Sequence, residues 1–404
     1  MRSDASLVCP NCNYEKSLIE IKSDCPVCHT PLALFQVKYK TVPKEFPLSN
    51  YNCSFFRYLP FLPLNKEEIL DPSVGNTPLI FSNNLAKHLN LKNLYIKDET
   101  RNPTGSFKDR GAIIGISIAK VLGYRIVNVP SSGNFASAIA RACAISNISC
   151  ITIVPKDTPD EKIIQIMAFG SKVLKINGIF DDCRKMSIEL SKKHNIPSAS
   201  WELRPFILEG WKTTIIEVLD QMNFSVPDVI IIPAGGGGHI LGTYKALKEL
   251  YSIGKIDHLP KIIGVQASGC SPYVKAFAKD LEEVLPEKNP RTIAKSLRVS
   301  NPFEGKYVLK AIREIKGSFI DVSDNEIINA IILLGKTEGI FAEPAGATPI
   351  AALNKLIEED KIENDEKIVV IITGSGLKDI SDLKDIYSRV SSISKSFNLK
   401  NILS

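Results

Sequence analysis

The chain has 404 residues, of which 44% are hydrophobic, and a formal net charge of +6. This length and apolar content can fill a large core and favour more than one lobe, which argues against a small disulfide-stapled domain. Lys and Arg are scattered, so the charge predicts a mixed solvated surface and no nucleic-acid partner. The N-terminus lacks a signal-like apolar segment and the apolar runs have strand length, so we expect no membrane span and a cytoplasmic location.

The first 40 residues contain two Cys-x-x-Cys pairs, Cys9 with Cys12 and Cys25 with Cys28. Each pair can supply one edge of a tetrahedral thiolate site, which is the ligand set of a zinc ribbon. The alternative, four unligated thiols, would leave them open to oxidation. We therefore predict a zinc-ribbon-like segment at residues 1–40, with a structural Zn²⁺ because no ligand position is left for water.

The five other cysteines occur singly, and a long chain with nine cysteines does not suggest a disulfide framework. Their mostly apolar or helical surroundings favour buried small hydrophobic residues over nucleophiles. They are Cys53, Cys143, Cys150, Cys183 and Cys270.

A Pro-rich, aromatic connector at residues 42–63 leads into alternating strand and helix patterns. Continuous Val/Ile runs are typical of parallel strands that are buried on both faces, so the predicted class is α/β. Strands are expected at 94–97, 126–130, 150–154, 173–176, 228–233, 262–266 and 368–373. Helices are expected at 111–122, 134–146, 162–169 and 181–194.

The first of these strands is followed by the sequence NPTGSFKDRG at residues 102–111. Its Asn-Pro and Thr-Gly pairs are turn formers, and a helix begins close to Lys108. The positive end of a helix lowers the pKa of a nearby lysine, and such a lysine can form a Schiff base. Taken alone, the pattern would be interpreted by default as an exposed helix lysine.

Two further strands are followed by residues that can bind anions at the beginning of a helix. After the second strand, Ser131, Ser132 and Asn134 offer hydroxyl, amide and backbone N–H groups to a carboxylate, although Ser132 or Asn134 could also be a plain helix cap. After the strand at 228–233, the sequence GGGGH at 235–239 can close its backbone N–H groups round a phosphate. A glycine run by itself could equally be a tight turn.

The last strand ends in the sequence TGSGLKD at residues 373–379, which places the Thr373 hydroxyl between a buried strand and glycines. The sequence EPAGA at 343–347 puts small residues ahead of a helix, where a flat group could approach the backbone. Open α/β sheets bind ligands at the carboxyl ends of their strands. A Schiff-base lysine, a phosphate cradle, a carboxylate loop and a hydroxyl partner for a ring nitrogen together predict a pyridoxal-phosphate site.

The sequence NPTGSFKDRG also resembles the cofactor-lysine motif of threonine synthases, which are pyridoxal-phosphate enzymes of fold type II. Further similar segments are TIA (292–294), GIFAEP (339–344) and TGSGLKD (373–379), within a similarity that spans about residues 74–379. The resemblance implies a two-lobed fold type II architecture, with mainly parallel sheets covered by helices. Residues 41–404 would form the catalytic domain, with a smaller mobile lobe at about 112–206. Some members of the family also carry an N-terminal cysteine ribbon.

The resemblance implies roles for individual residues. Lys108 would carry the cofactor, Asn134 would contact its 3′-oxygen, and Thr373 would bond its pyridine nitrogen. The phosphate would be held by Gly235, Gly236, Gly237, Gly238 and His239. The implied enzyme is a lyase of threonine biosynthesis, which converts O-phospho-L-homoserine and water to L-threonine and phosphate with Lys108 as the proton-transfer group.

Three departures from the family pattern leave the substrate open. Ile207 precedes LEGWKT (208–213), where members often carry an Arg that grips the substrate phosphate, and an apolar side chain cannot do this. The tetraglycine loop resembles that of serine and threonine dehydratases, and Ser375 replaces the His or Asn that is often found there. The candidate substrate residues are Ser131, Ser132, Lys212 and Arg204.

Two alternatives within pyridoxal-phosphate chemistry follow from these departures: a cysteate synthase-like replacement on O-phosphoserine, and a threonine or serine dehydratase-like lyase. A third alternative is a zinc-ribbon regulatory protein that keeps an inactive fold. The presence of Lys108, Asn134 and Thr373 argues against the third, because a non-enzyme needs none of them. Fold relatives are commonly dimers, so the resemblance implies a homodimer that acts on a small amino-acid substrate.

Overall fold

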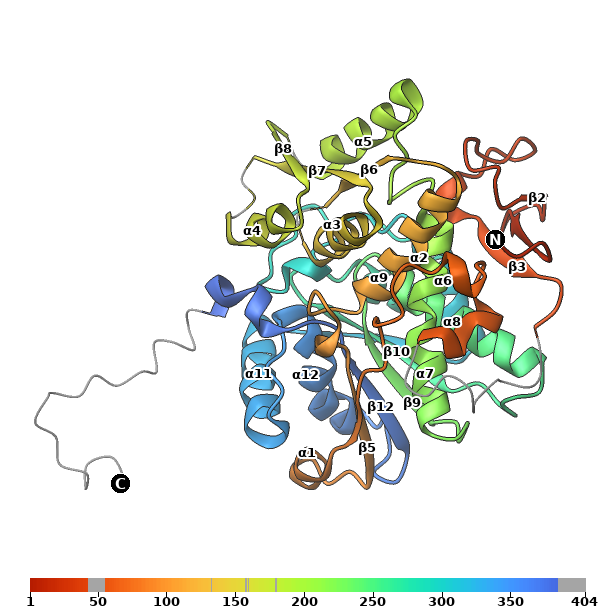
Figure 1. The fold of residues 1–404 in the computed structure, drawn as a ribbon. Coiled ribbons are helices and arrows are strands. Elements are labelled where there is room, and N and C mark those ends of the chain that lie inside the picture. The colour runs from red at the N-terminus through yellow and green to blue at the C-terminus, as the bar shows by residue number, and fades with distance from the viewer. Residues whose placement is uncertain (43–54, 132, 157, 159, 179, 384–404) are drawn as a thin grey trace, which may run out of the picture.

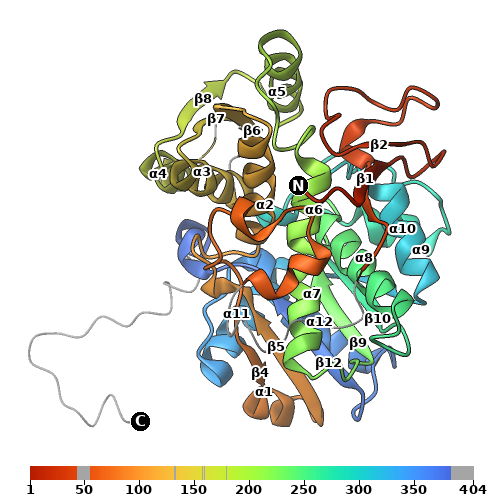
Figure 2. The same ribbon diagram turned by 45° about the vertical axis from the view of Figure 1, so that its right-hand side comes forward.

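The computed structural model describes residues 1–42, 55–131, 133–156, 158, 160–178 and 180–383, whose strands form three sheets (Figures 1 and 2). The largest sheet has the strand order β11-β10-β9-β12-β5-β4. Its strands are β4 (Leu79–Phe81), β5 (Asn93–Asp98), β9 (Val229–Pro233), β10 (Lys261–Ala267), β11 (Ser318–Val322) and β12 (Lys367–Ile372). All neighbours pair in parallel except β4, which runs antiparallel to β5 at one edge.

The apolar runs of this sheet face two separate cores. In β9, Val229 and Ile231 belong to one core, whereas Ile230 and Ile232 belong to the other. One face is covered by α12 (Pro344–Glu358), with α1 (Asn83–His88) and α11 (Asp324–Glu338) beside it. The other is covered by α7 (Thr213–Gln221), α8 (Gly238–Ser252) and α10 (Gly305–Glu314), and α9 (Pro272–Ala278) packs near β11. Burial on both faces explains why these strands lack polar alternation.

A second, parallel sheet has the order β6-β7-β8 and lies at the top of Figure 1. Its strands are β6 (Ile126–Pro130), β7 (Ser149–Pro155) and β8 (Lys172–Ile176), and its helices are α3 (Asn134–Ser146), α4 (Asp160–Ala168) and α5 (Phe180–His194). These elements fall within residues 112–206. The boundaries and mobility of a smaller lobe remain predictions.

Two helices connect the sheets and cross each other closely. The helix α2 (Lys108–Val121) leads from β5 towards β6, and α6 (Arg204–Trp211) leads back towards the large sheet. A Cβ on Gly210 would stand 2.0 Å from the Arg110 carbonyl oxygen, and one on Gly115 would stand 2.5 Å from Ile207 Cγ1. Glycine is therefore required for this close approach.

The N-terminal segment forms a small antiparallel sheet of order β2-β1-β3, made of β1 (Ala5–Val8), β2 (Glu15–Ser17) and β3 (Gln36–Tyr39). None of the described helices has both the length and the apolar character needed to cross a bilayer. The predicted burial of the single cysteines is confirmed for Cys143, Cys150, Cys183 and Cys270. Cys53 lies outside the described residues.

The α/β class, with mainly parallel sheets covered by helices, is confirmed. Each strand and helix expected in residues 94–373 is present, with its ends shifted by at most a few residues. The helices expected after the glycine run and after EPAGA are present as α8 and α12. The edge strand β4, the strand β11 and the helices α1, α6, α7, α9, α10 and α11 were not predicted.

Candidate active site

The turn that precedes Lys108 is fixed to the end of β12. The backbone N–H of Phe107 donates to the carbonyl oxygen of Thr373 at 3.1 Å, and Ser106 forms an isolated bridge with Gly374. The helix α2 then begins at Lys108. Two strand ends that were predicted to carry chemistry are thus joined directly by main-chain contacts.

The Lys108 side chain is enclosed by aromatic rings. Its Nζ atom lies 4.3 Å from the centre of the Phe107 ring and 4.1 Å from a ring centre of Trp211. Burial, followed by the positive charge of Arg204, lowers the pKa of Lys108 to about 7. A substantial fraction of the amine is therefore neutral near pH 7 and can act as a nucleophile or base.

The glycine run between β9 and α8 forms a tight loop. Gly237 has a φ of +94°, and a Cβ there would stand 2.5 Å from the Tyr273 hydroxyl oxygen. That hydroxyl donates to the Gly236 carbonyl oxygen at 3.2 Å. Because α8 begins at Gly238 and has 15 residues, its unpaired first-turn N–H groups gather at the loop. The loop is therefore suited to a phosphate.

His239 follows the loop, and its side chain is buried. Neither ring nitrogen has a hydrogen-bond partner among the described residues. Burial lowers the pKa of His239 to about 3. The imidazole is consequently neutral at physiological pH, and its side chain adds no charge to the loop.

Asn134 begins α3 and faces Glu343, which precedes α12. The Asn134 Nδ2 atom donates to both carboxylate oxygens of Glu343, at 2.9 and 2.8 Å. In the loop before it, the Gly133 N–H donates to Ser131 Oγ at 3.4 Å, and apart from its chain neighbours no described residue has an atom within 4 Å of the place where a Cβ on Gly133 would stand. Ser132 lies outside the described residues. This loop therefore borders open space.

Arg204, the first residue of α6, lies against the beginning of α8. Its Nη2 atom pairs with Glu304 at 2.5 Å, and its guanidinium carbon lies 4.4 Å from a ring centre of Trp211. A Cβ on Gly238 would stand 2.1 Å from Nη2. The Nη1 atom is buried, without a hydrogen-bond partner in the part of the chain that the structure describes. A positive charge with one unused donor thus lies beside the glycine loop and near Lys108.

Two other residues of the segment around α6 lie elsewhere. The Lys212 ammonium pairs with Glu209 at 2.5 Å and with Glu249 at 2.7 Å. A role for Lys212 in substrate binding stays a prediction, which this pairing does not favour. Ile207 is buried in the crossing with α2, opposite Gly115. Its side chain therefore packs between α2 and α6.

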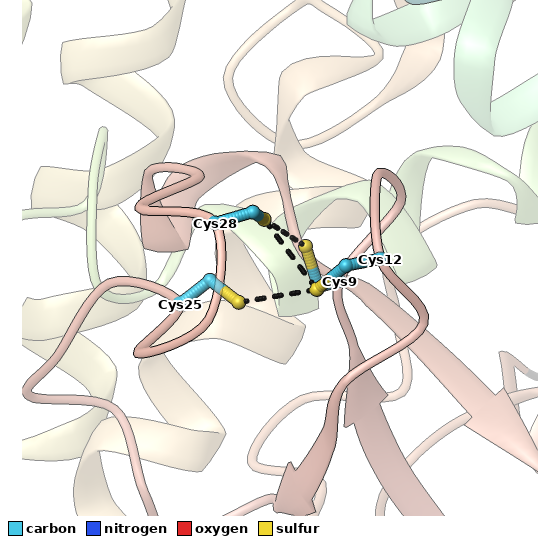
Figure 3. A group of neighbouring side chains, drawn as sticks. All are labelled: Cys9, Cys12, Cys25 and Cys28. Atoms are coloured by element: carbon cyan, nitrogen blue, oxygen red, sulfur yellow. Dashed lines mark hydrogen bonds between the residues drawn. The ribbon is translucent and has the colours of Figure 1, made fainter.

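The four cysteines predicted to bind zinc come together, and Figure 3 shows their sulfur atoms turned towards one another. The four Sγ atoms lie within 4.8 Å of one another. The Sγ atoms of Cys9 and Cys28 are 3.5 Å apart, and those of Cys12 and Cys25 are 3.4 Å apart. Tetrahedral zinc with Zn–S bonds of about 2.3 Å would place sulfurs about 3.8 Å apart, so the cluster suits such an ion.

This cysteine ribbon packs against two helices of the large lobe (Figure 2). The Tyr39 hydroxyl, at the end of β3, donates to Glu209 Oε2 on α6 at 2.6 Å. From α10, the Tyr307 hydroxyl donates to Asn11 Oδ1 at 2.8 Å. The ribbon therefore touches the same helices whose N-terminal ends hold Arg204 and Glu304.

Residues 70–374 match the family described as pyridoxal-phosphate dependent enzyme. The chain is 44% identical over 337 residues to the threonine synthase of Methanocaldococcus jannaschii, with 83% of each chain covered. It is 37% identical over 382 residues to the threonine synthase of Methanosarcina acetivorans, with 94% of each covered. The chain belongs to the threonine synthase family of pyridoxal-phosphate dependent lyases.

Solved structures share the fold of this threonine synthase family member. The processed form of threonine deaminase isoform 2 from Solanum lycopersicum has a TM-score of 0.69 and 26% identity, covering 86% of this chain and 98% of that one. Maize serine racemase has a TM-score of 0.68 and 23% identity, covering 80% and 94%. The fold type II architecture is therefore confirmed.

The residues of this threonine synthase family member fit the family's cofactor. Buried donor atoms without a hydrogen-bond partner among the described residues include three from the segments around Lys108: Ser106 Oγ, Arg204 Nη1 and Trp211 Nε1. Apart from its chain neighbours, no residue that the structure describes has an atom within 4 Å of a Cβ position at Gly236, so the loop faces open space there. Unused donors, a nucleophilic amine and a glycine cradle are the groups that an aromatic phosphate ester requires.

Sequence reasoning missed several residues that line this site. Trp211 and Phe107 enclose Lys108, and Glu304 pairs with Arg204. Glu343 was noted only as part of a small-residue motif, although it contacts Asn134 directly. A glutamate immediately before a buried helix start was the available signal, because an unpaired buried carboxylate is costly.

Proposed function

We propose that this chain converts O-phospho-L-homoserine and water to L-threonine and phosphate. The threonine synthases of Methanocaldococcus jannaschii and Methanosarcina acetivorans, which this chain resembles, support this reaction by their names. The observation that carries the proposal is the position of Lys108, a partly buried lysine with a pKa lowered to about 7, close to Arg204, whose Nη1 donor is unused. Proton transfer next to a phosphate-bearing substrate needs these two groups together.

The cofactor contacts are part of the proposal. Lys108 would link to pyridoxal phosphate, which when bound supplies the electron sink for ionising bonds next to the substrate amino group. The loop at 235–239 would hold the phosphate, Asn134 would contact the 3′-oxygen, and Thr373 would bond the ring nitrogen. Because a threonine hydroxyl carries no charge, it would leave that nitrogen largely unprotonated and restrain transamination.

Lys108 would perform the proton transfers. Its neutral Nζ, released when the substrate amino group takes its place, would remove the proton from the substrate α-carbon and then move protons at the β- and γ-carbons. The Phe107 and Trp211 rings lie against that amine and reduce its contact with water, which favours its neutral, basic form.

Arg204 and Ser131 are the proposed substrate contacts, together with Ser132 in its predicted role. Arg204 Nη1 would donate to the substrate phosphate, and a guanidinium is suited to this because it is planar and always charged. Ser131 would donate to the substrate carboxylate. Ile207 would then need no part in phosphate binding.

A product assay tests the reaction. The purified enzyme receives O-phosphohomoserine, threonine, serine, or O-phosphoserine with sulfite, and phosphate, keto acid and amino-acid products are quantified. We expect equal amounts of phosphate and threonine from O-phosphohomoserine as the dominant activity. Dominant ketobutyrate formation from threonine, or cysteate formation from O-phosphoserine, would replace the proposal with one of the two alternative reactions.

We also infer that the cysteine ribbon holds a structural Zn²⁺. The four-thiolate set and its sulfur spacing support this choice. Metal analysis of the purified protein is expected to find about one zinc per chain, and Cys9→Ser with Cys12→Ser should abolish it. The homodimer and the cytoplasmic location stay predictions.

A further inference from the structure

The contact between Asn134 and Glu343 joins the helix α3 beside the small sheet to α12 beneath the large one, across 209 residues of sequence. Both carboxylate oxygens accept from the same amide nitrogen, at 2.9 and 2.8 Å. Glu343 itself is only 2% exposed. Glu343 is thus a buried carboxylate that contacts a residue proposed to bind the cofactor. This position suggests a role beyond capping α12.

Glu343 is held firmly in place. Its backbone N–H donates to the Gly374 carbonyl oxygen at 2.9 Å. Its carboxylate lies against Gly374, where a Cβ would stand 2.5 Å from Oε1 and 3.1 Å from Oε2. The carboxylate therefore occupies a slot between the strand end that carries Thr373 and the N-terminus of α3, and only glycine at 374 leaves room for it.

The charge of this group determines the orientation of the Asn134 side chain. An ionised carboxylate has only acceptors, so the amide nitrogen must face it, and the amide cannot turn its oxygen that way without repulsion. The second amide N–H and the oxygen Oδ1 are then directed away from Glu343 in one defined arrangement. A neutral partner, such as glutamine, would allow both arrangements of the amide.

Several charged groups act on Glu343. Asp379 and Lys378 follow β12, Lys162 lies on α4, and Lys108 begins α2. Burial, followed by Asp379, raises the pKa of Glu343 to about 7, while the hydrogen bond from Asn134 and the two lysines Lys378 and Lys162 oppose that rise. Glu343 is therefore about half ionised near pH 7 and mostly ionised above it, and the hydrogen bond from Asn134 is the largest of the three effects that favour the ionised form.

We propose that Glu343 is a positioning residue, which orients the Asn134 amide so that its free N–H points to the lysine-bound cofactor. This inference rests on the proposed contact between Asn134 and the cofactor 3′-oxygen. It is independent of the substrate, because cofactor binding and absorbance are measured without one. A failed product assay would therefore leave it untouched.

The test is a double-mutant cycle of Glu343→Gln and Asn134→Ala. The enzyme is examined with its cofactor bound, for absorbance, and after removal of the cofactor, for rebinding. The readouts are the position of the visible absorbance band and the dissociation constant for pyridoxal phosphate. Glu343→Gln alone is expected to shift the band and to weaken cofactor binding about tenfold, the scale of a lost charge-assisted hydrogen bond. In the Asn134→Ala background, Glu343→Gln should change neither readout.

Equal effects of Glu343→Gln with and without Asn134→Ala would overturn the proposal, as would the absence of any effect in folded protein. Glu338→Gln is the matched control, because the Glu338 carboxylate also accepts hydrogen bonds from another part of the chain, from Ser82 Oγ and the Leu85 N–H, but lies at the end of α11. If Glu343→Gln fails to fold, Gly374→Ala serves instead, since it displaces the carboxylate from the other side. That variant must then show the same dependence on Asn134.

Discussion

The imidazole of His239 stacks on the ring of Phe107, with ring centres 4.1 Å apart and 13° between the planes. Phe107 is the residue before Lys108, and His239 is the residue after the glycine loop. The stack therefore joins the proposed phosphate cradle to the residue that positions the lysine. Both rings are buried, so the contact excludes water between the two segments.

This stack predicts a pH-dependent stability. Burial lowers the pKa of His239 from 6.5 to about 3. Between about pH 3 and pH 6.5, His239 is therefore protonated in the unfolded chain and neutral in the folded chain. Stability should then fall as pH drops below about 6.5, by about 2 kcal/mol between pH 7 and pH 5 for this group. Denaturant unfolding of the enzyme and of His239→Phe measures the difference. The variant should lose about 2 kcal/mol less over this range, whereas His88→Gln controls for loss of an exposed histidine.

Lys108→Ala should remove both the cofactor linkage and turnover. The visible absorbance band of the lysine-bound cofactor is expected to disappear, and activity should fall by at least about 10²–10⁴-fold, the range of a general base. Lys248→Ala, which removes an exposed lysine paired with Glu314, is the control and should keep the band. A retained band in Lys108→Ala would contradict the assignment of this lysine.

Arg204→Gln should weaken recognition of a phosphate-bearing substrate. The variant loses one charge-assisted hydrogen bond to the phosphate, so its kcat/KM should decrease about 10–100-fold. Inorganic phosphate should also inhibit it more weakly. Glu304→Gln, which keeps the guanidinium but removes its partner at 2.5 Å, should retain phosphate inhibition. Unchanged phosphate inhibition in Arg204→Gln would exclude a phosphate contact for this residue.

The crossing of α2 and α6 predicts opposite effects at two helix glycines. Gly115→Ala should destabilise the protein by about 1–3 kcal/mol, because the added Cβ would stand 2.5 Å from Ile207. Gly335→Ala on α11, where a Cβ would stand 4.0 Å from the Ile340 carbonyl oxygen, should instead stabilise it by up to about 1 kcal/mol. Denaturant unfolding midpoints of both variants, compared with that of the unmodified protein, measure these two changes in stability. A neutral Gly115→Ala would show that the helices can separate at little cost.

Metal removal should destabilise the cysteine ribbon and also the helix α6, which the ribbon contacts. Treatment with a chelator is expected to increase amide hydrogen exchange in β1, β2 and β3 and also in α6, because Tyr39 ties the ribbon to Glu209. Tyr39→Phe should reproduce the change in α6 alone, and Tyr251→Phe, at a position 48% exposed, is the control. Increased exchange confined to residues 5–39 would mean that the ribbon is energetically independent.

Much of the fold followed from local patterns. Buried Val/Ile runs marked the strands, and turn formers ahead of Lys108 marked the beginning of α2, because both signals report the backbone near them. The contact of Asn134 with Glu343 could not be predicted in the same way, since it depends on how two sheets are arranged. The pKa of Lys108 was expected to follow from a helix dipole, whereas burial is its largest cause. Burial of one side chain depends on distant residues such as Trp211.

The position of β12 in the middle of the large sheet has a consequence for synthesis of the chain. The cysteine ribbon and the sheet of β6, β7 and β8 are complete once residue 176 has left the ribosome, but β5 and β9 cannot be joined until residues 367–372 follow. Pairing β5 with β12 closes a loop of more than 260 residues. This step is slow, because the chain loses the entropy of closing the loop before the strands form their stabilising contacts. Since Phe107 is tied to Thr373, the cofactor site is assembled last, and a nascent chain cannot bind its cofactor early.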